Sequence, residues 1–292
     1  MADFGTKTTT TNLAAVTPKA GLSRFAVPKL TIILVIAWIV ALVPFLFFRE
    51  TWFSRPLSDQ QVGEYLHSDH KPDQIQYALS QIGQRMSRHD ASVTIWYPDL
   101  LRLCSHRSED VRIEDAEAMS NDPSRGDFHE ALLRMLRDQS RAVRLRAALA
   151  LVRFGDDAGH KEIVDSLAPW ALETDSDGRV NYLARVGSSV RRGAVIAEVM
   201  TPAGSATFRT PVSGRVQYVS VRVNDPISKG TELLSIAPNA QQVMASLVAL
   251  YQIGLPEDLP IIAGFQQLLP DMPQRVTQQA VLTERAIRER AK

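Results

Sequence analysis

Histidine and carboxylate side chains gather in one short stretch, and metal binding is the chemistry that they suggest first. Asp59 and Glu64 are followed by His67, Asp69 and His70. A His-x-x-His pair holds a metal ion only when further ligands stand at a defined spacing, and none follows nearby. We therefore interpret the stretch as a solvated linker and expect no metal site there.

A second acidic stretch has the start of a calcium-binding pattern. Glu173, Asp175 and Asp177 precede Gly178. The later ligands of a calcium loop, including the glutamate that closes it at its twelfth position, are missing. The better interpretation is a turn that leads into a strand.

The sequence also lacks the common catalytic patterns. It contains no G-x-S-x-G, Walker loop, dinucleotide fingerprint, H-E-x-x-H or C-x-x-C, and its six histidines are scattered singly before residue 161. We expect a protein that is not an enzyme, uses no cofactor and has no small-molecule substrate.

Composition narrows the classes of partner. The formal net charge of +1 gives no general electrostatic case for nucleic acid. The one cysteine, Cys104, excludes an internal disulfide, and its LLRLC setting predicts a buried helix position.

An unbroken apolar run from Leu30 to Phe48 lies between Lys29 and Arg49. A helix of about 19 residues spans the ~30 Å hydrocarbon core of a bilayer, so residues 30–48 are predicted to form a transmembrane helix. A signal peptide would need a small-residue cleavage site, and a buried core helix is rarely apolar on all sides for so long. Within and beside the helix, Trp38 is part of the run, Pro44 is tolerable in a membrane and Trp52 suits the interface.

The charges around this run predict its orientation. The tail, residues 1–29, carries Lys7, Lys19, Arg24 and Lys29 against one acid, Asp3. The positive-inside rule favours a cytoplasmic N-terminus. We therefore expect a single-pass protein of the inner membrane, with a connector at residues 49–71 and a periplasmic main domain.

From residue 72 the pattern is helical. Ile75, Leu79 and Ile82 recur at spacings of three and four, and the pattern around Val111 repeats 32 residues later around Val143. A period of this length with two helices per unit is typical of an α-solenoid. The segment AALALVRFGDDAGHKEIVDSL, residues 147–167, resembles a HEAT repeat. That resemblance covers residues 72–172 and implies a scaffold that binds proteins.

Six arginines lie along the later part of this helical region. They are Arg134, Arg137, Arg141, Arg144, Arg146 and Arg153. They could form a stripe for phosphate groups, but acidic residues lie just upstream, and an exposed helical face is the commoner explanation.

Residues 173–238 change to a pattern of short strands. One half begins at Gly178 with GRVNYLARVGSSVRRGAVIAEV, and a similar half begins at Gly214. Gly193 in the first half corresponds to Gly230 in the second, and each lies in a turn. Two such halves predict a flattened β-sandwich, with glycines where turns need a positive φ.

This sandwich resembles the biotinyl/lipoyl carrier domain, and equally the sandwich-hybrid domain of membrane fusion proteins. The segment TPVSGRV, residues 210–216, carries the match to the second half. A working carrier presents a modified lysine 11 residues before the glycine that matches Gly214. Here that residue is Ala203, so the resemblance implies a rigid β module without biotin or lipoate.

Helices return in residues 239–292. When Gly254 is aligned with Gly155, Leu250 falls on Leu151 and Ile262 on Ile163. The simplest account is a helical array interrupted by the sandwich, with the last helices packing back on the array. A separate trailing hairpin is the alternative.

The expected fold class is therefore α+β: a single transmembrane helix, HEAT-like helical pairs and an inserted lipoyl-like sandwich. The expected function is a non-catalytic structural or assembly subunit of a large membrane complex, for example photosynthetic or respiratory, whose partners are the bilayer and neighbouring subunits. A membrane-fusion adaptor is the alternative, but only about 14 residues separate Val199 from Gly214, which leaves no room for its long helical hairpin. A carrier subunit of an enzyme complex is the third hypothesis.

Overall fold

The computed structural model describes residues 56–68, 71–269 and 271–292, and it corrects the membrane part of the expected fold. No helix in these ranges is both long and apolar enough to cross a bilayer. The longest, α11 (Gln274–Arg290), has 17 residues and is rich in charge. The predicted span, residues 30–48, and Trp52 lie outside the described residues. The described fold is thus α+β without a transmembrane helix, and the single-pass inner-membrane topology with a periplasmic domain is not upheld.

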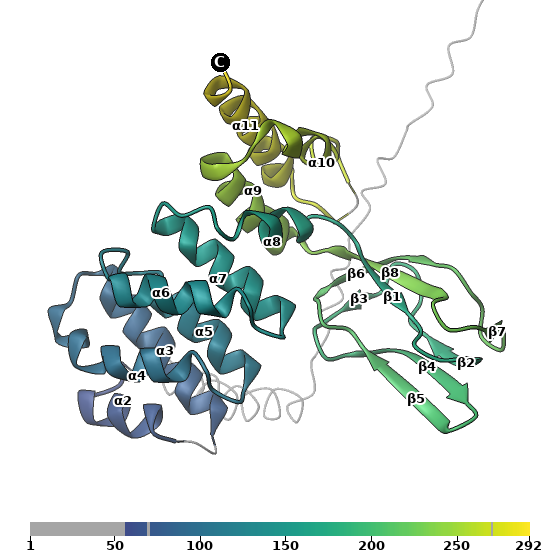
Figure 1. Cartoon of the computed structure of the whole chain (residues 1–292), viewed down its shortest axis with the longest axis horizontal. Coiled ribbons are helices and arrows are strands. Elements are labelled where there is room, and N and C mark those ends of the chain that lie inside the picture. The colour runs from purple at the N-terminus through teal and green to yellow at the C-terminus, as the bar shows by residue number, and fades with distance from the viewer. Residues whose placement is uncertain (1–55, 69–70, 270) are drawn as a thin grey trace, which may run out of the picture. The chain divides into compact units, whose positions relative to one another are not determined.

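The first half of the described chain is a series of short helices (Figure 1). They are α2 (Asp59–Leu66), α3 (Pro72–Ser87), η1 (Ala91–Trp96), α4 (Tyr97–Leu103), α5 (Glu109–Met119), α6 (Gly126–Met135), α7 (Arg141–Arg153) and α8 (His160–Asp165).

Local sequence signals set where these helices begin and end. Ser58 caps α2 and forms a reciprocal capping box with Gln61, while the Ser140 hydroxyl accepts a hydrogen bond from the Val143 amide at the start of α7. Pro72 stands in the first turn of α3, where its missing N–H costs nothing. Gly155, with φ of 75°, ends α7 in the left-handed region.

The odd-numbered helices α3, α5 and α7 lie side by side in that order (Figure 1). Together with residues of the even-numbered helices, such as Phe128 of α6, they form one continuous apolar core, which also includes the fully buried Leu79, Met119 and Leu151. Because each helix buries a face against both neighbours, no single helical pair holds this core alone.

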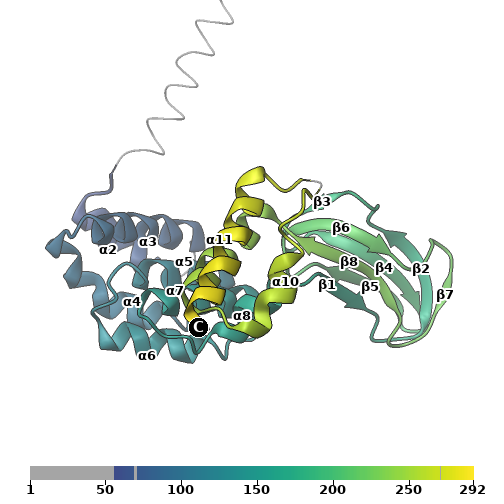
Figure 2. The same cartoon turned by 90° about the horizontal axis from the view of Figure 1, so that it is seen from above.

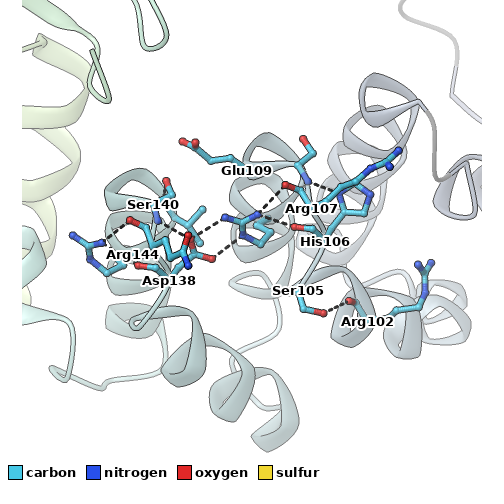
Figure 3. Close-up of polar contacts among 12 residues, drawn as sticks. Arg102, Ser105, His106, Arg107, Glu109, Asp138, Ser140 and Arg144 are labelled. Carbon is cyan, nitrogen blue, oxygen red and sulfur yellow. Dashed lines mark hydrogen bonds and ion pairs between the residues drawn. The ribbon is translucent and has the colours of Figure 1, made fainter. Parts of the chain in front are cut away.

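Two arginines 32 residues apart, one in α5 and one in α7, each bond the turn that precedes their own helix (Figure 3). Arg144 donates to the carbonyl oxygens of Asp138 and Gln139, at 3.0 and 3.2 Å. Thirty-two residues earlier, Arg112 donates to the carbonyl of His106 at 2.7 Å. Arg112 also reaches the Asp138 carboxylate with two bonds, of 2.7 and 2.9 Å. The periodicity of the sequence therefore extends to its polar contacts.

Strands form the next segment, in two four-stranded antiparallel sheets. One sheet has the order β1-β8-β6-β3 and the other β5-β4-β2-β7. The strands are β1 (Trp170–Glu173), β2 (Gly178–Leu183), β3 (Ser189–Val190), β4 (Val195–Thr201), β5 (Gly204–Arg209), β6 (Gly214–Val219), β7 (Pro226–Ile227) and β8 (Glu232–Pro238). Alternate residues such as Val180, Val199, Val216 and Leu234 meet between the sheets in a separate core.

The four glycines singled out in the sequence serve two purposes. Gly193 and Gly230 take φ of 80° and 83° in matching turns, where a side chain would be strained. Gly178 and Gly214 instead begin β2 and β6. A Cβ on Gly178 would lie 2.5 Å from the Met200 carbonyl oxygen, and one on Gly214 would overlap that of Ala237. Close approach of neighbouring strands therefore explains this second pair, rather than a positive φ.

After the sandwich come α9 (Ala240–Ile253), η2 (Pro256–Asp258), α10 (Leu259–Ala263) and α11. Helix α9 packs against α7 and α8 on one side and α11 on the other (Figure 1). Figure 2 shows the strands gathered on one side of the helices. Ala148 and Val152 of α7 share a core with Val243, Leu247 and Leu250 of α9. Thus α9 takes the place beside α7 that α7 takes beside α5, although the whole sandwich lies between them in the chain.

Histidine–aspartate contacts follow the same arrangement. His129 of α6 bonds Asp156, after α7, at 2.6 Å, and His160 of α8 bonds Asp258, after α9, at 2.7 Å. In both cases a second helix of one unit contacts the turn of the next. The sandwich is accordingly inserted in a helical array. Its first strand, β1, pairs with its last strand, β8, at Trp170 and Ile236, so the two ends of the sandwich lie side by side.

Candidate functional site

The β4–β5 hairpin is the place where a carrier domain would present its lysine. Thr201 pairs with Gly204, so Pro202 and Ala203 form a two-residue turn at the exposed tip. The Thr201 hydroxyl accepts from the Ala203 amide at 3.2 Å and donates to the Gly204 carbonyl at 2.9 Å. Ala203 therefore stands at the tip of this hairpin and offers no amine.

The sandwich contains one lysine elsewhere. Lys229 lies in the turn between β7 and β8, and its backbone amide donates to the Asp177 carboxylate at 2.8 Å. Asp177 thus stabilises the turn between β7 and β8. Of the suspected calcium ligands, Asp175 bonds the neighbouring Ser176 hydroxyl at 3.1 Å. The segment is a turn into β2, as predicted from its missing ligands.

The suspected metal stretch is only partly described, because residues 69 and 70 lie outside the structure. His67 contacts the Asp99 carboxylate at 3.4 Å and the Gly63 carbonyl at 2.9 Å. Across residues 56–68, 71–269 and 271–292, no group of three or more histidine, cysteine or acidic side chains is placed to hold a metal ion.

A cleft of about 990 Å³ opens where the sandwich meets the helices. Its walls come from α5, α7, the β3–β4 turn, the loop before β6, and α9, with one residue of α11. Five arginines and no acidic residue line it: Arg141, Arg146, Arg191, Arg192 and Arg275. We call this site the arginine cleft.

Three of these arginines are held by the helices. Arg192 of the β3–β4 turn bonds Glu109 at 2.5 Å and also pairs with Asp110, both in α5. Arg146 pairs with Glu117 at 2.5 Å, and Arg141 donates to the Asp165 carbonyl at 2.6 Å.

The other two are available to a ligand. Arg191 and Arg275 are exposed, and neither side chain makes a hydrogen bond or ion pair with another described residue. The apolar part of the lining includes Leu145, Leu149 and Val212. The cleft combines free guanidinium groups with apolar surface, which suits binding of an anionic group attached to an apolar one.

The arginine stripe suspected from the sequence does not form as one surface. Of its six members only Arg141 and Arg146 enter the cleft. Arg144 bonds Glu162 at 2.9 Å, and Arg153 donates to the Ser120 hydroxyl at 3.0 Å. The remaining cleft arginines come from distant segments; the one local signal for them is the Arg191–Arg192 dipeptide in an exposed turn.

Buried titratable groups lie apart from the arginine cleft. Asp115 of α5 is fully buried, and neither of its carboxyl oxygens has a hydrogen-bond partner in the described structure. Burial raises the pKa of Asp115 well above its usual value. Burial likewise raises the pKa of the Cys104 thiol, which donates to the Leu101 carbonyl at 3.0 Å. A half-buried thiol with a raised pKa is a poor nucleophile.

Comparison with known proteins identifies the sandwich. A family model described as "Biotin-requiring enzyme" matches residues 168–236, so these residues form a biotin/lipoyl-type domain. The match covers under a quarter of the 292 residues. No comparison supports a relationship of residues 72–172 to HEAT repeats. A search of curated proteins finds no match.

One solved structure similar to this chain is a single-chain, multi-domain long-chain acyl-CoA carboxylase. The identity is 18%, and the match covers 46% of this chain and 14% of the carboxylase. The TM-score of 0.24 is too low for the arrangement of domains to be compared. The aligned part is a small fraction of that enzyme's length.

Proposed function

We propose that this protein is a non-catalytic assembly subunit, whose helical array and sandwich bind neighbouring subunits of a larger complex. The observation that carries the proposal is the hairpin tip, where Ala203 occupies the place of the carrier lysine. Without an amine at this tip, no acyl or carboxyl group can be carried there. The domain keeps the sandwich of a carrier and lacks its reactive group.

The attachment of the sandwich supports the same proposal. A carrier domain has to move its cofactor between sites, whereas this sandwich is bound to α5 through Arg192. It is also bound to α9, because the Asn239 side chain donates to the Ser213 carbonyl at 3.2 Å. These contacts favour a fixed module that presents a surface.

A carrier of biotin or lipoate is the second candidate, favoured by the family match. Its one possible acceptor in residues 168–236 is Lys229. That lysine stands in the turn between β7 and β8, not at the β4–β5 tip, so modification there would need a different presentation to the attaching enzyme.

Intact-mass measurement separates the two candidates. The full chain would be produced in cells that also express a biotin ligase and a lipoate ligase, with a known carrier domain as the positive control. We expect the unmodified mass for this chain and the modified mass for the control. A mass increase that disappears in Lys229→Arg would establish the carrier function and overturn our proposal.

The assembly role has its own test. The tagged chain would be purified from its native cells and analysed by size exclusion with mass spectrometry of the co-migrating proteins. We expect partners in a fixed stoichiometry that survives the column. A chain that elutes alone, as a monomer, would contradict an assembly function.

A further inference from the structure

We propose that the arginine cleft binds an acidic peptide segment of a partner protein. This inference rests on the proposed assembly function and names the kind of partner. The segment would place its carboxylates on Arg191 and Arg275, and its apolar side chains on the Leu145–Leu149 face of α7.

The charge balance of the cleft favours an anionic partner. Its five arginines face three acids, Glu109, Asp110 and Glu117, which are paired with Arg192 and Arg146. Five positive charges less three negative charges leave a net charge of +2 at the site. That surplus resides on exposed guanidinium groups, which form bidentate hydrogen bonds with carboxylates.

The size and lining of the cleft favour a peptide over a lone anion. A volume of about 990 Å³ lies at the upper end of the ~300–1,000 Å³ typical of ligand pockets, far above the needs of one carboxylate or phosphate. Leu149, Val212 and Met244 give it an apolar wall. The exposed Gln241 amide, which has no bond to another described residue, can meet a peptide backbone.

Nucleic acid fits the same lining less well. Proteins that bind single strands usually combine basic groups with aromatic side chains on which bases stack. None of the residues that line the arginine cleft is aromatic. Phosphate groups could meet the arginines, but the apolar wall would contact no base face.

The chain itself does not supply a matching segment. Residues 1–55 carry two acids, Asp3 and Glu50, against six lysines and arginines. The acidic start of α5 already faces the cleft arginines through Glu109 and Asp110. Neither residues 1–55 nor the start of α5 offers a free acidic segment, which favours another protein as its source.

Selection from a random 12-residue peptide library tests the proposal. The full chain would be the target, and the double variant R191E/R275E the counter-target. We expect the enriched peptides to contain more aspartate and glutamate than the library, together with leucine-like residues. Binding of the strongest peptide, measured by fluorescence anisotropy, should weaken about tenfold or more in the double variant and should weaken as salt is raised.

Arg185→Glu is the matched control, because Arg185 is an exposed arginine of the sandwich outside the cleft whose side chain makes no bond to other described residues. It should bind the peptide as the unaltered chain does. Circular dichroism should show that both variants are folded, since neither the Arg191 nor the Arg275 side chain makes a hydrogen bond or ion pair with a described residue.

Three results would overturn the inference: no enrichment of acidic peptides, equal binding by R191E/R275E, or tighter binding of a single-stranded DNA oligonucleotide than of any selected peptide. The last would assign the cleft to nucleic acid. Each result is independent of the intact-mass measurement and of the co-migration test, so failure of the cleft inference is distinguishable from failure of the assembly function.

Discussion

Asp115 lies in the core of the helical array, where its carboxyl group destabilises the fold. It is fully buried without a described hydrogen-bond partner, and the residue 32 positions later in the repeat is Ala147. An unsatisfied buried polar group costs about 1–3 kcal/mol. The raised pKa of Asp115 shows that the folded protein favours its neutral form.

We predict that Asp115→Ala raises the free energy of unfolding by about 1–3 kcal/mol at pH 7. Because the folded pKa of Asp115 lies above the unfolded one, its stability penalty is absent below about pH 3.9 and grows as pH rises towards the folded pKa. Chemical denaturation at pH 7 and pH 4 should therefore show the gain shrinking in acid. The reverse change, Ala147→Asp, should destabilise the fold; a loss of stability in Asp115→Ala at both pH values would refute this account.

Asp138 shows the opposite electrostatic behaviour. Burial opposes its charge, but hydrogen bonds from Arg112 and from the Ser140 amide hold the pKa of Asp138 below its usual value. Its contribution to stability is therefore complete above the unfolded pKa of about 3.9, and it is lost as pH falls through the lower folded pKa.

Asp138→Asn should accordingly lower the free energy of unfolding by about 1–3 kcal/mol at pH 7, with the deficit shrinking in acid. Urea titrations from pH 7 to about pH 3 would measure it. Asp157→Asn is the control, since Asp157 is exposed and its carboxylate makes no bond to other described residues. If the stability lost in Asp138→Asn stays constant with pH, the charge of Asp138 does not cause the loss.

Among the larger elements, the sandwich and the helical array have separate cores. We predict that residues 171–236 can be replaced by a short Gly-Ser linker while the array stays folded. Trp170 pairs with Ile236, the neighbour of the other cut end Ala237, and paired strand residues lie only about 5 Å apart, so a short linker can join the ends. Circular dichroism and denaturation should show retained helix and a stability change below about 2 kcal/mol, because the ion pairs lost are partly exposed.

A longer deletion provides the comparison. Removing residues 171–253 also takes α9 and exposes the side of α7 that carries Ala148 and Val152. Each buried leucine or valine of α9 contributes about 1.5–3 kcal/mol, so this form should unfold or aggregate. Equal stability of the two deletions would show that α9 is not part of the array.

The sequence predicted those elements whose signal is local. The two halves of the sandwich follow from turn glycines and alternating valines, whereas the position of Ala203 came from the resemblance to carrier domains. Alignment of Gly254 with Gly155 led us to expect that the last helices pack back on the array, and Leu250 of α9 shares a core with Val152 of α7. The last helix, α11, buries Val276, Ala280 and Ile287 along one face. Val281, which follows Ala280 in the sequence, is exposed.

The features that could not be predicted from the sequence depend on tertiary structure. The arginine cleft joins residues from α7, the β3–β4 turn and α11, which no spacing relates. The role of Gly214 depends on how closely a neighbouring strand approaches. Arg144 and Arg153 read as surface charges, yet they bond across turns and helices. Such contacts become visible only when distant segments are folded together.

Residues 57–292 form one compact unit, in which the sandwich contacts the array at few points. Arg192 is the residue that pairs with two acids of α5 at once. Close charge pairs in partly buried settings contribute more than fully exposed ones. The position of the sandwich relative to the array therefore depends on Arg192 more than on the more exposed Arg215 of β6, which pairs with Asp271 alone.

We predict that Arg192→Glu loosens the sandwich without unfolding either part, because it sets three acidic groups against one another. Spin labels at Ser205→Cys and Glu130→Cys, in a Cys104→Ser background, would report the distance between the hairpin and α6. Both label sites are exposed, and Cys104 is the chain's one cysteine. The distance distribution should be narrow with Arg192 and broad with glutamate, while Arg185→Glu leaves it narrow. A distribution that stays narrow in Arg192→Glu would assign the attachment to the other ties instead, namely the Asn239 bond at the start of α9 and the ion pair of Arg215 with Asp271.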